Sequence, residues 1–268
     1  MIGIFDSGLG GLTVFKAIKK RLPDYSYIYL GDSARSPYGG RSQEVIYEYT
    51  RQAVDFLFKQ GCQLIILACN TASSEALRLL QQEWLPKNYP DRRILGVIRP
   101  LVEEAALVTK NNRLGVIGTR ATISSGAYGK ELKDQKKDVK IFSVACPLLV
   151  PLIEEGWIDR VETKMILKKY LRSLKDFNID TLILGCTHYP LLIKDIKRIC
   201  GKKINVLDAP QIVAEKTADY LKRHPEIIAV LERKKSVKFL TTDDARKFSE
   251  LASRFWGSKI IAEKISLA

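Results

Sequence analysis

Histidine is scarce in this chain, which has two among its 268 residues, at His188 and His224. The five cysteines are odd in number, and no C-x-x-C pair occurs. We therefore expect neither a disulfide framework nor a zinc centre built on paired cysteines. Cys186 and His188 stand in a C-x-H arrangement, but they could hold a metal only if other ligands converged on them. No metal site is predicted.

Long apolar runs are also missing, since no stretch of about 18 apolar residues occurs, and no membrane-spanning helix is expected. The start, "MIGIFDSG", has neither the basic residues nor the long apolar stretch of a secretory signal. These features predict a cytoplasmic protein. The 268 residues are 46% hydrophobic, enough for one large or two small domains with packed cores.

The charge is strongly one-sided, with 44 Lys and Arg against 30 Asp and Glu and a net charge of +14. Such an excess is typical of proteins that bind nucleic acid or an anionic surface. Here the lysines are spread over many segments and are not interleaved with aromatic residues as in a stacking platform. We favour a solvated basic surface and expect no nucleic acid partner, although a positive field would also attract small anionic substrates.

Apolar runs alternate with amphipathic stretches of helix length along the whole chain. One helix is expected over 43–59 with Ser42 as its N-cap, and Pro100 suits the first turn of another. A third, over 161–174, is expected to bury Val161 and Met165 beside its leucines. Buried strands separated by helices indicate an α/β protein with parallel sheets. The expected strands are 2–6, 25–31, 63–69, 94–98, 113–118, 139–145, 181–186, 204–208 and 236–241.

A weak internal repeat divides the chain into two related α/β halves. "LIILACNTAS" at 64–73 resembles "TLILGCTHYP" at 181–190, and "IGIFDSG" at 2–8 resembles "LGVIGT" at 114–119. Ligands of parallel sheets bind at the carboxyl ends of the strands. If the halves face each other, Cys69 and Cys186 converge on one cleft from opposite sides.

Two strand-end thiols suggest a particular reaction. A thiol just before a helix lies near backbone N–H groups and the positive end of the helix dipole, which favours thiolate. Two such groups could act as acid and base on opposite faces of one carbon, as inversion of a stereocentre by proton transfer requires. Asp6 and His188 are ionisable neighbours able to tune them.

The surrounding motifs supply donors for a carboxylate. Asn70, Thr71 and Thr187 carry hydroxyl or amide groups, and the loops "DSG" (6–8) and "SPYGG" (36–40) have free backbone N–H groups. Taken alone, a buried cysteine is more often a packing residue, which is our interpretation of Cys62, Cys146 and Cys200.

Five motifs together resemble glutamate racemases of the aspartate/glutamate racemase family: "IFDSGLGGLTV", "YLGDSARSPYGGRS", "ILACNTAS", "GVIGTRAT" and "LILGCTHYP". The resemblance covers essentially the whole chain, in order. It implies a cofactor-independent isomerase that interconverts L- and D-glutamate and supplies D-glutamate for peptidoglycan. It also implies a homodimer and two facing flavodoxin-like domains related by a pseudo-twofold axis, with the site in the cleft between them. We place these domains at 1–97 plus 208–268 and at 98–207.

The resemblance also assigns roles to individual residues. Cys69 matches the catalytic thiol that serves D-glutamate, and Cys186 the one that serves L-glutamate. Asp6 would assist Cys69, and His188 with Glu154 would assist Cys186, although Glu155 beside Glu154 leaves that register open. The substrate-binding positions that match are Asp6, Ser7, Tyr38, Gly39, Asn70, Thr71, Thr119, Thr122, Thr187 and His188.

Two alternatives stay open at this point. An aspartate racemase of the same superfamily would use the same two thiols, although "CNTA" with "GCTHYP" and "PYG" favours glutamate. A basic nucleic-acid-binding protein with vestigial racemase motifs is the second alternative. A pyridoxal enzyme would need a Schiff-base lysine, and the strand-end motifs hold none, so no cofactor is expected.

Overall fold

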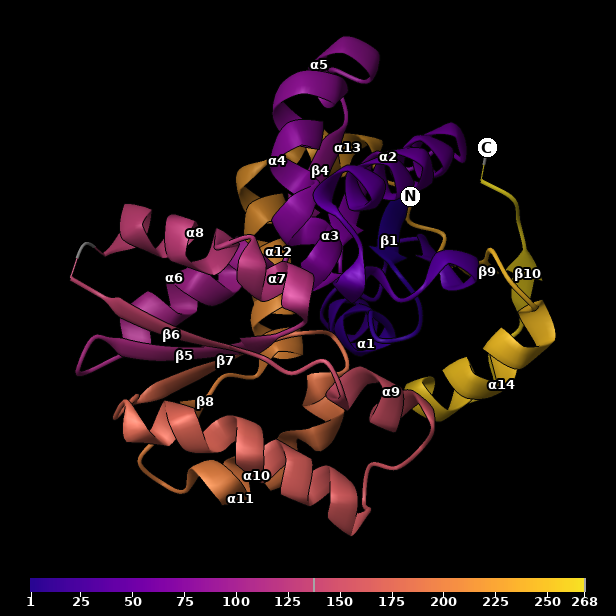
Figure 1. The fold of residues 1–268 in the computed structure, drawn as a ribbon. Helices are drawn as coiled ribbons and strands as arrows, with labels where there is room; N and C mark the ends of the chain where they lie inside the picture. Colours follow the sequence, from indigo (N-terminus) through magenta and orange to yellow (C-terminus); the bar gives the residue numbers. More distant parts are fainter. Residues whose placement is uncertain (137, 268) are drawn as a thin grey trace.

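The computed structural model, which describes residues 1–136 and 138–267, contains two parallel β-sheets (Figure 1). One sheet has six strands in the order β10-β9-β2-β1-β3-β4, and the other has four in the order β6-β5-β7-β8. This arrangement confirms the predicted α/β class. The strands are β1 Ile2–Asp6, β2 Tyr27–Gly31, β3 Leu64–Leu67, β4 Arg93–Gly96, β5 Arg113–Gly118, β6 Lys140–Ala145, β7 Thr181–Gly185, β8 Asn205–Val206, β9 Val237–Thr241 and β10 Ala262–Lys264.

The six-stranded sheet is buried on both faces. Because side chains alternate along a strand, Ile2 and Ile4 of β1 enter one apolar cluster and Phe5 enters another. The first cluster lies under α1, α12, α13 and α14, and the second lies under α2 and α3. These helices are α1 Leu12–Arg21, α2 Gln43–Lys59, α3 Asn70–Glu75, α12 Ala209–Arg223, α13 Pro225–Val230 and α14 Ala245–Trp256.

The four-stranded sheet is also covered on both faces, as Figure 1 shows for the lower half of the molecule. Leu114 and Val116 of β5 pack with α6 and α8, whereas Ile117 packs with α10 and α11. The helices of this half are α6 Ile98–Val108, α7 Arg120–Ser124, α8 Ala127–Gln135, α9 Leu149–Glu154, α10 Val161–Asp176 and α11 Ile193–Cys200.

Short helical turns join these layers. Between α3 and β4 the chain forms α4 Leu77–Leu79, a π-helical turn Leu80–Trp84 and α5 Leu85–Asn88. The remaining turns are 3₁₀ helices at Ser33–Arg35, Tyr38–Gly40 and Tyr189–Leu192.

Several strand limits differ from the sequence-based expectations. β3 ends at Leu67 and β7 at Gly185, so both cysteines lie just outside their strands rather than at the last position. β4 ends at Gly96 because Ile98 already begins α6. Pro100 does lie in the first turn of that helix, as expected. β10 was not expected, since its three residues AEK carry no continuous apolar signal.

The two helices expected from periodicity gave different outcomes. α2 spans 43–59, and the Ser42 side chain accepts a hydrogen bond from Val45 N, so both the range and the cap are confirmed. In α10, however, Val161 and Met165 are exposed, whereas Leu167, Leu171 and Leu174 are buried. At 3.6 residues per turn, Val161 and Met165 lie on the helix side opposite the leucines, so that expectation was wrong.

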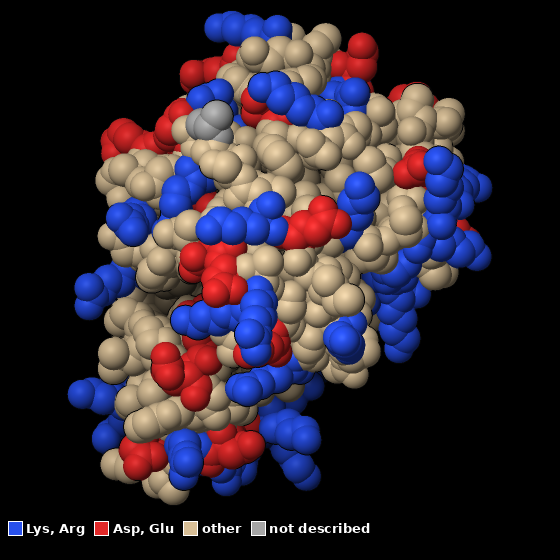
Figure 2. Space-filling view, turned by 90° about the vertical axis from the view of Figure 1, so that its right-hand side faces the viewer, with Lys and Arg blue, Asp and Glu red and all other residues tan. Residues whose placement is uncertain are grey.

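The sheets take their strands from different parts of the chain. The six-stranded sheet uses residues up to Gly96 and from Val237 onward, and the four-stranded sheet uses 113–206. Domain boundaries near 97 and 208 remain a prediction. None of the helices in the described ranges has the length and apolar character to cross a membrane. Basic side chains are dispersed over the face in Figure 2, with acidic ones among them.

Asp180 offers a test of how the second sheet is anchored. Its carboxylate accepts hydrogen bonds from the Thr109 and Thr181 hydroxyls and from the backbone N–H groups of Lys110 and Asn111. Burial opposes ionisation, but these bonds outweigh it and lower the pKa of Asp180. Asp180→Asn should reduce the free energy of unfolding at pH 7 by about 2 kcal/mol, measured by urea denaturation.

The pH dependence gives the control for this prediction. A carboxyl whose pKa is lower in the folded protein stabilises it above the ordinary pKa of aspartate, and that stability is lost as the pH falls through the folded value. The difference between wild type and Asp180→Asn should therefore shrink on acidification. A difference that is constant from neutral to acidic pH would contradict this account of Asp180.

Candidate active site

A cleft of about 380 Å³ lies between the two sheets and contains both predicted thiols. Cys69 follows β3 of the six-stranded sheet, and Cys186 follows β7 of the four-stranded sheet. They are 5% and 6% exposed, so each thiol is nearly closed to solvent while still lining the cleft. The structure thus brings the two cysteines of the internal repeat to one site.

Cys69 is held by groups of its own half of the molecule. It is the N-cap of α3. Its Sγ accepts from Ala72 N at 3.5 Å and donates to Ser7 Oγ, also at 3.5 Å. Burial, followed by the charge of Asp6, raises the pKa of Cys69 to about 12 against these hydrogen bonds. The expectation that the helix start favours a thiolate here was wrong, because desolvation outweighs the donors.

Cys186 belongs to a chain of three ionisable groups. His188 Nδ1 lies 3.8 Å from Cys186 Sγ, and His188 Nε2 lies 3.0 Å from Glu154 Oε1. Burial opposes protonation of the imidazole, but the bonds with Cys186 and Glu154 outweigh it and raise the pKa of His188 to about 10. At neutral pH both ring N–H groups therefore donate, one to sulfur and one to carboxylate. Glu154, rather than Glu155, contacts the histidine.

Asp6 lies at the end of β1, between the two thiol environments. Its carboxylate accepts from Gly8 N at 3.0 Å and from Thr187 Oγ1 at 3.3 Å. Burial is the largest influence and raises the pKa of Asp6, while His188, these donors and the Gly11 N–H act in the opposite direction. Asp6 is thus a buried carboxyl group that joins the Cys69 side to the loop carrying Cys186.

Three threonine hydroxyls meet across the cleft. Thr71 Oγ1 lies 3.0 Å from Thr119 Oγ1 and 3.2 Å from Thr122 Oγ1, and the last two are 3.0 Å apart. Thr71 comes from α3 of the first half, and the others come from the start of α7 in the second half. The three hydroxyls therefore form one cluster of donors suited to a carboxylate.

All five residues of the loop 36–40 line the cleft. The Tyr38 hydroxyl does not serve the cleft, because it donates to the buried carboxylate of Asp32. Gly39 approaches Thr119 so closely that a Cβ there would lie 2.7 Å from Thr119 Cβ. Tyr38 therefore anchors the loop, and the close contact at Gly39 excludes a larger residue.

Several residues that line the cleft or hold its lining residues were not predicted from the sequence. Tyr128 of α8 donates to Asn70 Oδ1 at 2.6 Å and so orients an amide that lines the cleft. Asp32 holds Tyr38, and nothing in its local pattern distinguishes it from a turn residue. Cys146, interpreted as a packing residue, also lines the cleft, as does the exposed Arg120. Cys146 directly follows β6, as Cys186 directly follows β7. This shared position in the sequence could have indicated that Cys146 lines the cleft.

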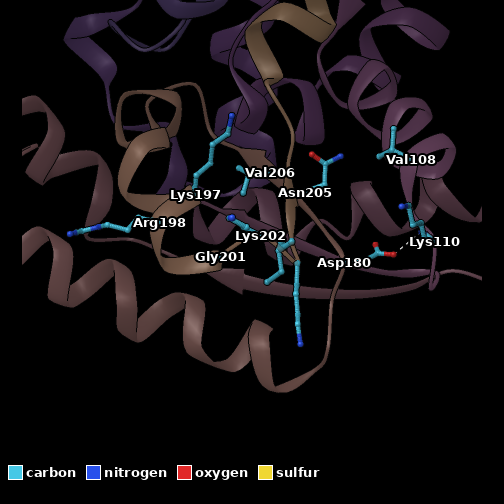
Figure 3. A pocket seen from close by; sticks show the side chains of 11 residues that line it. Val108, Lys110, Asp180, Lys197, Arg198, Gly201, Lys202, Asn205 and Val206 are labelled. Atoms are coloured by element: carbon cyan, nitrogen blue, oxygen red, sulfur yellow. Dashed lines mark hydrogen bonds between the residues drawn. The ribbon is translucent and has the colours of Figure 1, made fainter.

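A second, larger hollow of about 840 Å³ lies elsewhere, beside Asp180 and the edge strand β8. Asp180 precedes β7, whereas Cys186 follows it, so this hollow is at the end of the strand away from the thiols. Its cations do not converge on one point: in Figure 3 Lys197 and Arg198 point away from each other, and Lys110 lies on the far side. Among the described residues, its lining contains neither a cysteine nor a histidine.

A metal ion needs several ligand side chains close together. Within 1–136 and 138–267, no three His, Cys, Asp or Glu side chains gather closely enough to hold one. All five cysteines are free thiols.

Two thiols that face one cleft from two parallel sheets are typical of enzymes that transfer protons on both faces of one carbon atom. The profile of the Asp/Glu/Hydantoin racemase family matches residues 10–217 of the chain. A glutamate racemase of Persephonella marina is 44% identical over 268 residues, covering 100% of this chain and 97% of the relative. The chain belongs to this racemase family, which confirms the resemblance found in the five motifs.

Solved structures give the same result. A glutamate racemase isoform of Bacillus anthracis superposes with a TM-score of 0.91 at 35% identity, covering 100% of this chain and 97% of that one. A glutamate racemase of Francisella tularensis in complex with D-glutamate superposes with a TM-score of 0.88 at 33% identity, covering 99% and 97%. The predicted fold of two facing α/β halves is thereby confirmed.

The charge of Asp6 should control the ionisation of Cys69. Asp6→Asn keeps the size of the side chain but removes the second largest contribution that raises the pKa of Cys69. The midpoint for alkylation of Cys69 by iodoacetamide, followed by peptide mass spectrometry against pH, should move to lower pH. Asp219→Asn, at an exposed surface position, is the matched control and should leave the midpoint in place. An unmoved midpoint in Asp6→Asn would exclude this electrostatic role.

Proposed function

We propose that the protein interconverts L- and D-glutamate by proton transfer at Cα, without a cofactor, using Cys69 and Cys186 as paired acid and base. The observation that carries this proposal is that the two thiols line one cleft from different sheets. One thiol removes the Cα proton from one face, and the other delivers a proton to the opposite face. Positioned acid–base groups of this kind typically contribute about 10²–10⁴ in rate.

The ionisation of the free site supports an order of events. With a pKa of about 12, Cys69 holds its proton at neutral pH and can act as the acid. The Cys186 sulfur receives an N–H donor from a protonated His188, which suits it to act as the base. For L-glutamate we assign Cys186 as the base and Cys69 as the acid. Turnover of D-glutamate requires the opposite protonation.

The donors in the cleft fall into two groups, which suits a dicarboxylic substrate. The hydroxyls of Thr71, Thr119 and Thr122 form one group, all within 3.2 Å of one another. The second consists of the Asn70 amide, which Tyr128 orients, and the backbone of the loop 36–40. We assign one substrate carboxylate to each group, with Ser7 and Thr187 completing the wall near the two thiols.

The wider role follows from the same proposal. D-glutamate made in this way would supply peptidoglycan synthesis, and the enzyme would work in the cytoplasm as a homodimer. The resemblance of the motifs and the naming of the relatives as glutamate racemases support this role. We also retain two domains, 1–97 plus 208–268 and 98–207, whose proposed limits agree with the membership of the two sheets.

The substrate itself can be tested directly. An amino-acid panel that includes both enantiomers of glutamate and aspartate, followed by optical rotation without added cofactor, should show inversion of glutamate at the highest kcat/KM. Inversion of aspartate in preference to glutamate would contradict the proposed substrate. Loss of glutamate inversion after dialysis against chelator, with recovery on adding a metal, would contradict the cofactor-free reaction.

Thr71 tests the carboxylate site. Thr71→Val keeps the shape of the side chain but removes a hydroxyl that reaches both Thr119 and Thr122. Loss of one hydrogen bond to a charged group should lower kcat/KM roughly tenfold to a hundredfold. Thr71→Ser, which retains the hydroxyl, is the matched control and should stay much nearer to wild type. An unchanged kcat/KM in Thr71→Val would remove Thr71 from the substrate site.

A further inference from the structure

The loop that carries Cys186 and His188 belongs to the four-stranded sheet, yet residues of the other half surround it. The loop follows β7, and its one bond to Glu154, from His188, stays within its own half. We propose that Gly10 in the turn before α1, Thr13 in α1 and Phe255 in α14 are positioning residues that hold His188 against Cys186. Both helices pack on the six-stranded sheet. This proposal rests on the proposed function of the same site, and it makes one half of the molecule complete the acid–base pair of the other.

Thr13 provides the bond that carries this inference furthest. It lies in the first turn of α1, and its hydroxyl is 2.9 Å from the carbonyl oxygen of Thr187 and 2.9 Å from that of Gly10. Thr187 stands between Cys186 and His188 in sequence. A donor on its carbonyl therefore fixes the peptide from which the imidazole extends.

Gly10 sets the distance of approach. A Cβ at this position would lie 2.3 Å from Thr187 Oγ1 and 2.4 Å from His188 Nδ1, so only glycine allows the loop to lie against α1. The contact is made with the ring nitrogen that faces Cys186, which means that a side chain here would displace the imidazole from the sulfur.

Phe255 closes another side of the imidazole. The rings of Phe255 and His188 are 6.1 Å apart between centroids and are inclined at 88°, an edge-to-face arrangement. Phe255 lies in α14 and packs against apolar clusters of both halves. It therefore joins the two cores at the point where the histidine is held.

The charged and titratable groups around His188 are Cys186 and Glu154, which bond its two nitrogens, and the Asp6 carboxylate. Gly10 and Thr13 carry no charge, so they act on the ionisation of His188 by holding the ring in place. Phe255 is also uncharged, but it adds to the burial of the ring, which opposes protonation. If the imidazole is no longer held, its bonds to Cys186 and Glu154 lengthen. Because these bonds raise the pKa of His188, that pKa should then fall.

This chain is well suited to a direct test, since its two histidines give only two pairs of ring-nitrogen signals in NMR of the ¹⁵N-histidine-labelled protein. Thr13→Val should lower kcat for both enantiomers roughly threefold to tenfold with KM changed less than about twofold, as expected for loss of one neutral hydrogen bond. It should also move the titration of His188 from a midpoint of about 10 toward lower pH. Thr13→Ser keeps the hydroxyl and should restore both properties.

Two further variants serve as controls. Thr217→Val removes a hydroxyl that bonds only the Val213 carbonyl inside α12, and it should change neither kcat nor the His188 signal. Phe255→Ala should lower kcat more than Phe248→Ala, although Phe248 is the more buried residue in the same helix.

The outcomes separate this proposal from the proposed function. A His188 titration in Thr13→Val that equals wild type would overturn the positioning role, whatever the activity. The same holds for a Thr13→Ser variant that behaves like Thr13→Val. If the wild type does not invert glutamate, the proposed function fails, while the NMR comparison still decides whether Thr13 positions His188.

Discussion

Parallel strands bring their carboxyl ends to one edge of a sheet, and the site depends on two such edges facing each other. Asp6 ends β1, Cys69 follows β3, Thr119 follows β5 and Cys186 follows β7. Two thiols far apart in the chain can flank one small molecule only because both sheets present these ends to the same cleft. The bond between Asp6 and Thr187 and the cluster of three threonine hydroxyls join the edges directly.

Burial affects the ionisable groups on the two sides of the cleft differently. At Cys69 it acts with the charge of Asp6, and the available donors do not compensate, so the proton stays on sulfur at neutral pH. At His188 burial is outweighed by bonds to Cys186 and Glu154. A pseudo-symmetric fold thus carries an asymmetric pair of acid–base groups, which a reaction that uses one acid and one base requires. The threonine cluster has one member from the first half and two from the second, so the carboxylate site that we propose there would depend on both halves.

The sequence predicted best those features that depend on a single local property, such as an apolar segment or a repeated motif. Apolar-rich segments predicted nine of the ten strands in the described residues. The clearest were β1, β2, β3 and β7, which are buried throughout, because strands buried on both faces need no alternation. The repeated cysteine motif revealed the two thiols. The short edge strand β10 was missed because its residues carry no apolar run.

The remaining features depend on contacts between distant segments. The pKa of Cys69 is raised mainly by burial, which the local motif does not encode. Its position at a helix start had led us to expect a lowered pKa. Tyr128, Thr13 and Phe255 reach the site from helices whose own patterns read as ordinary packing. The choice of Glu154 over Glu155 was settled by which side of a short helix faces His188. Such information lies in the tertiary structure rather than in any local pattern.

The central claim is that two thiols act on opposite faces of one carbon, and isotope incorporation tests it most directly. When L-glutamate is converted in D₂O and sampled early, the D-glutamate formed should carry deuterium at Cα, while the remaining L-glutamate should carry little. This result is expected because the proton removed by Cys186 is not the one delivered by Cys69. Equal deuterium content in substrate and product at early conversion would indicate a single base that serves both faces, and it would contradict the account.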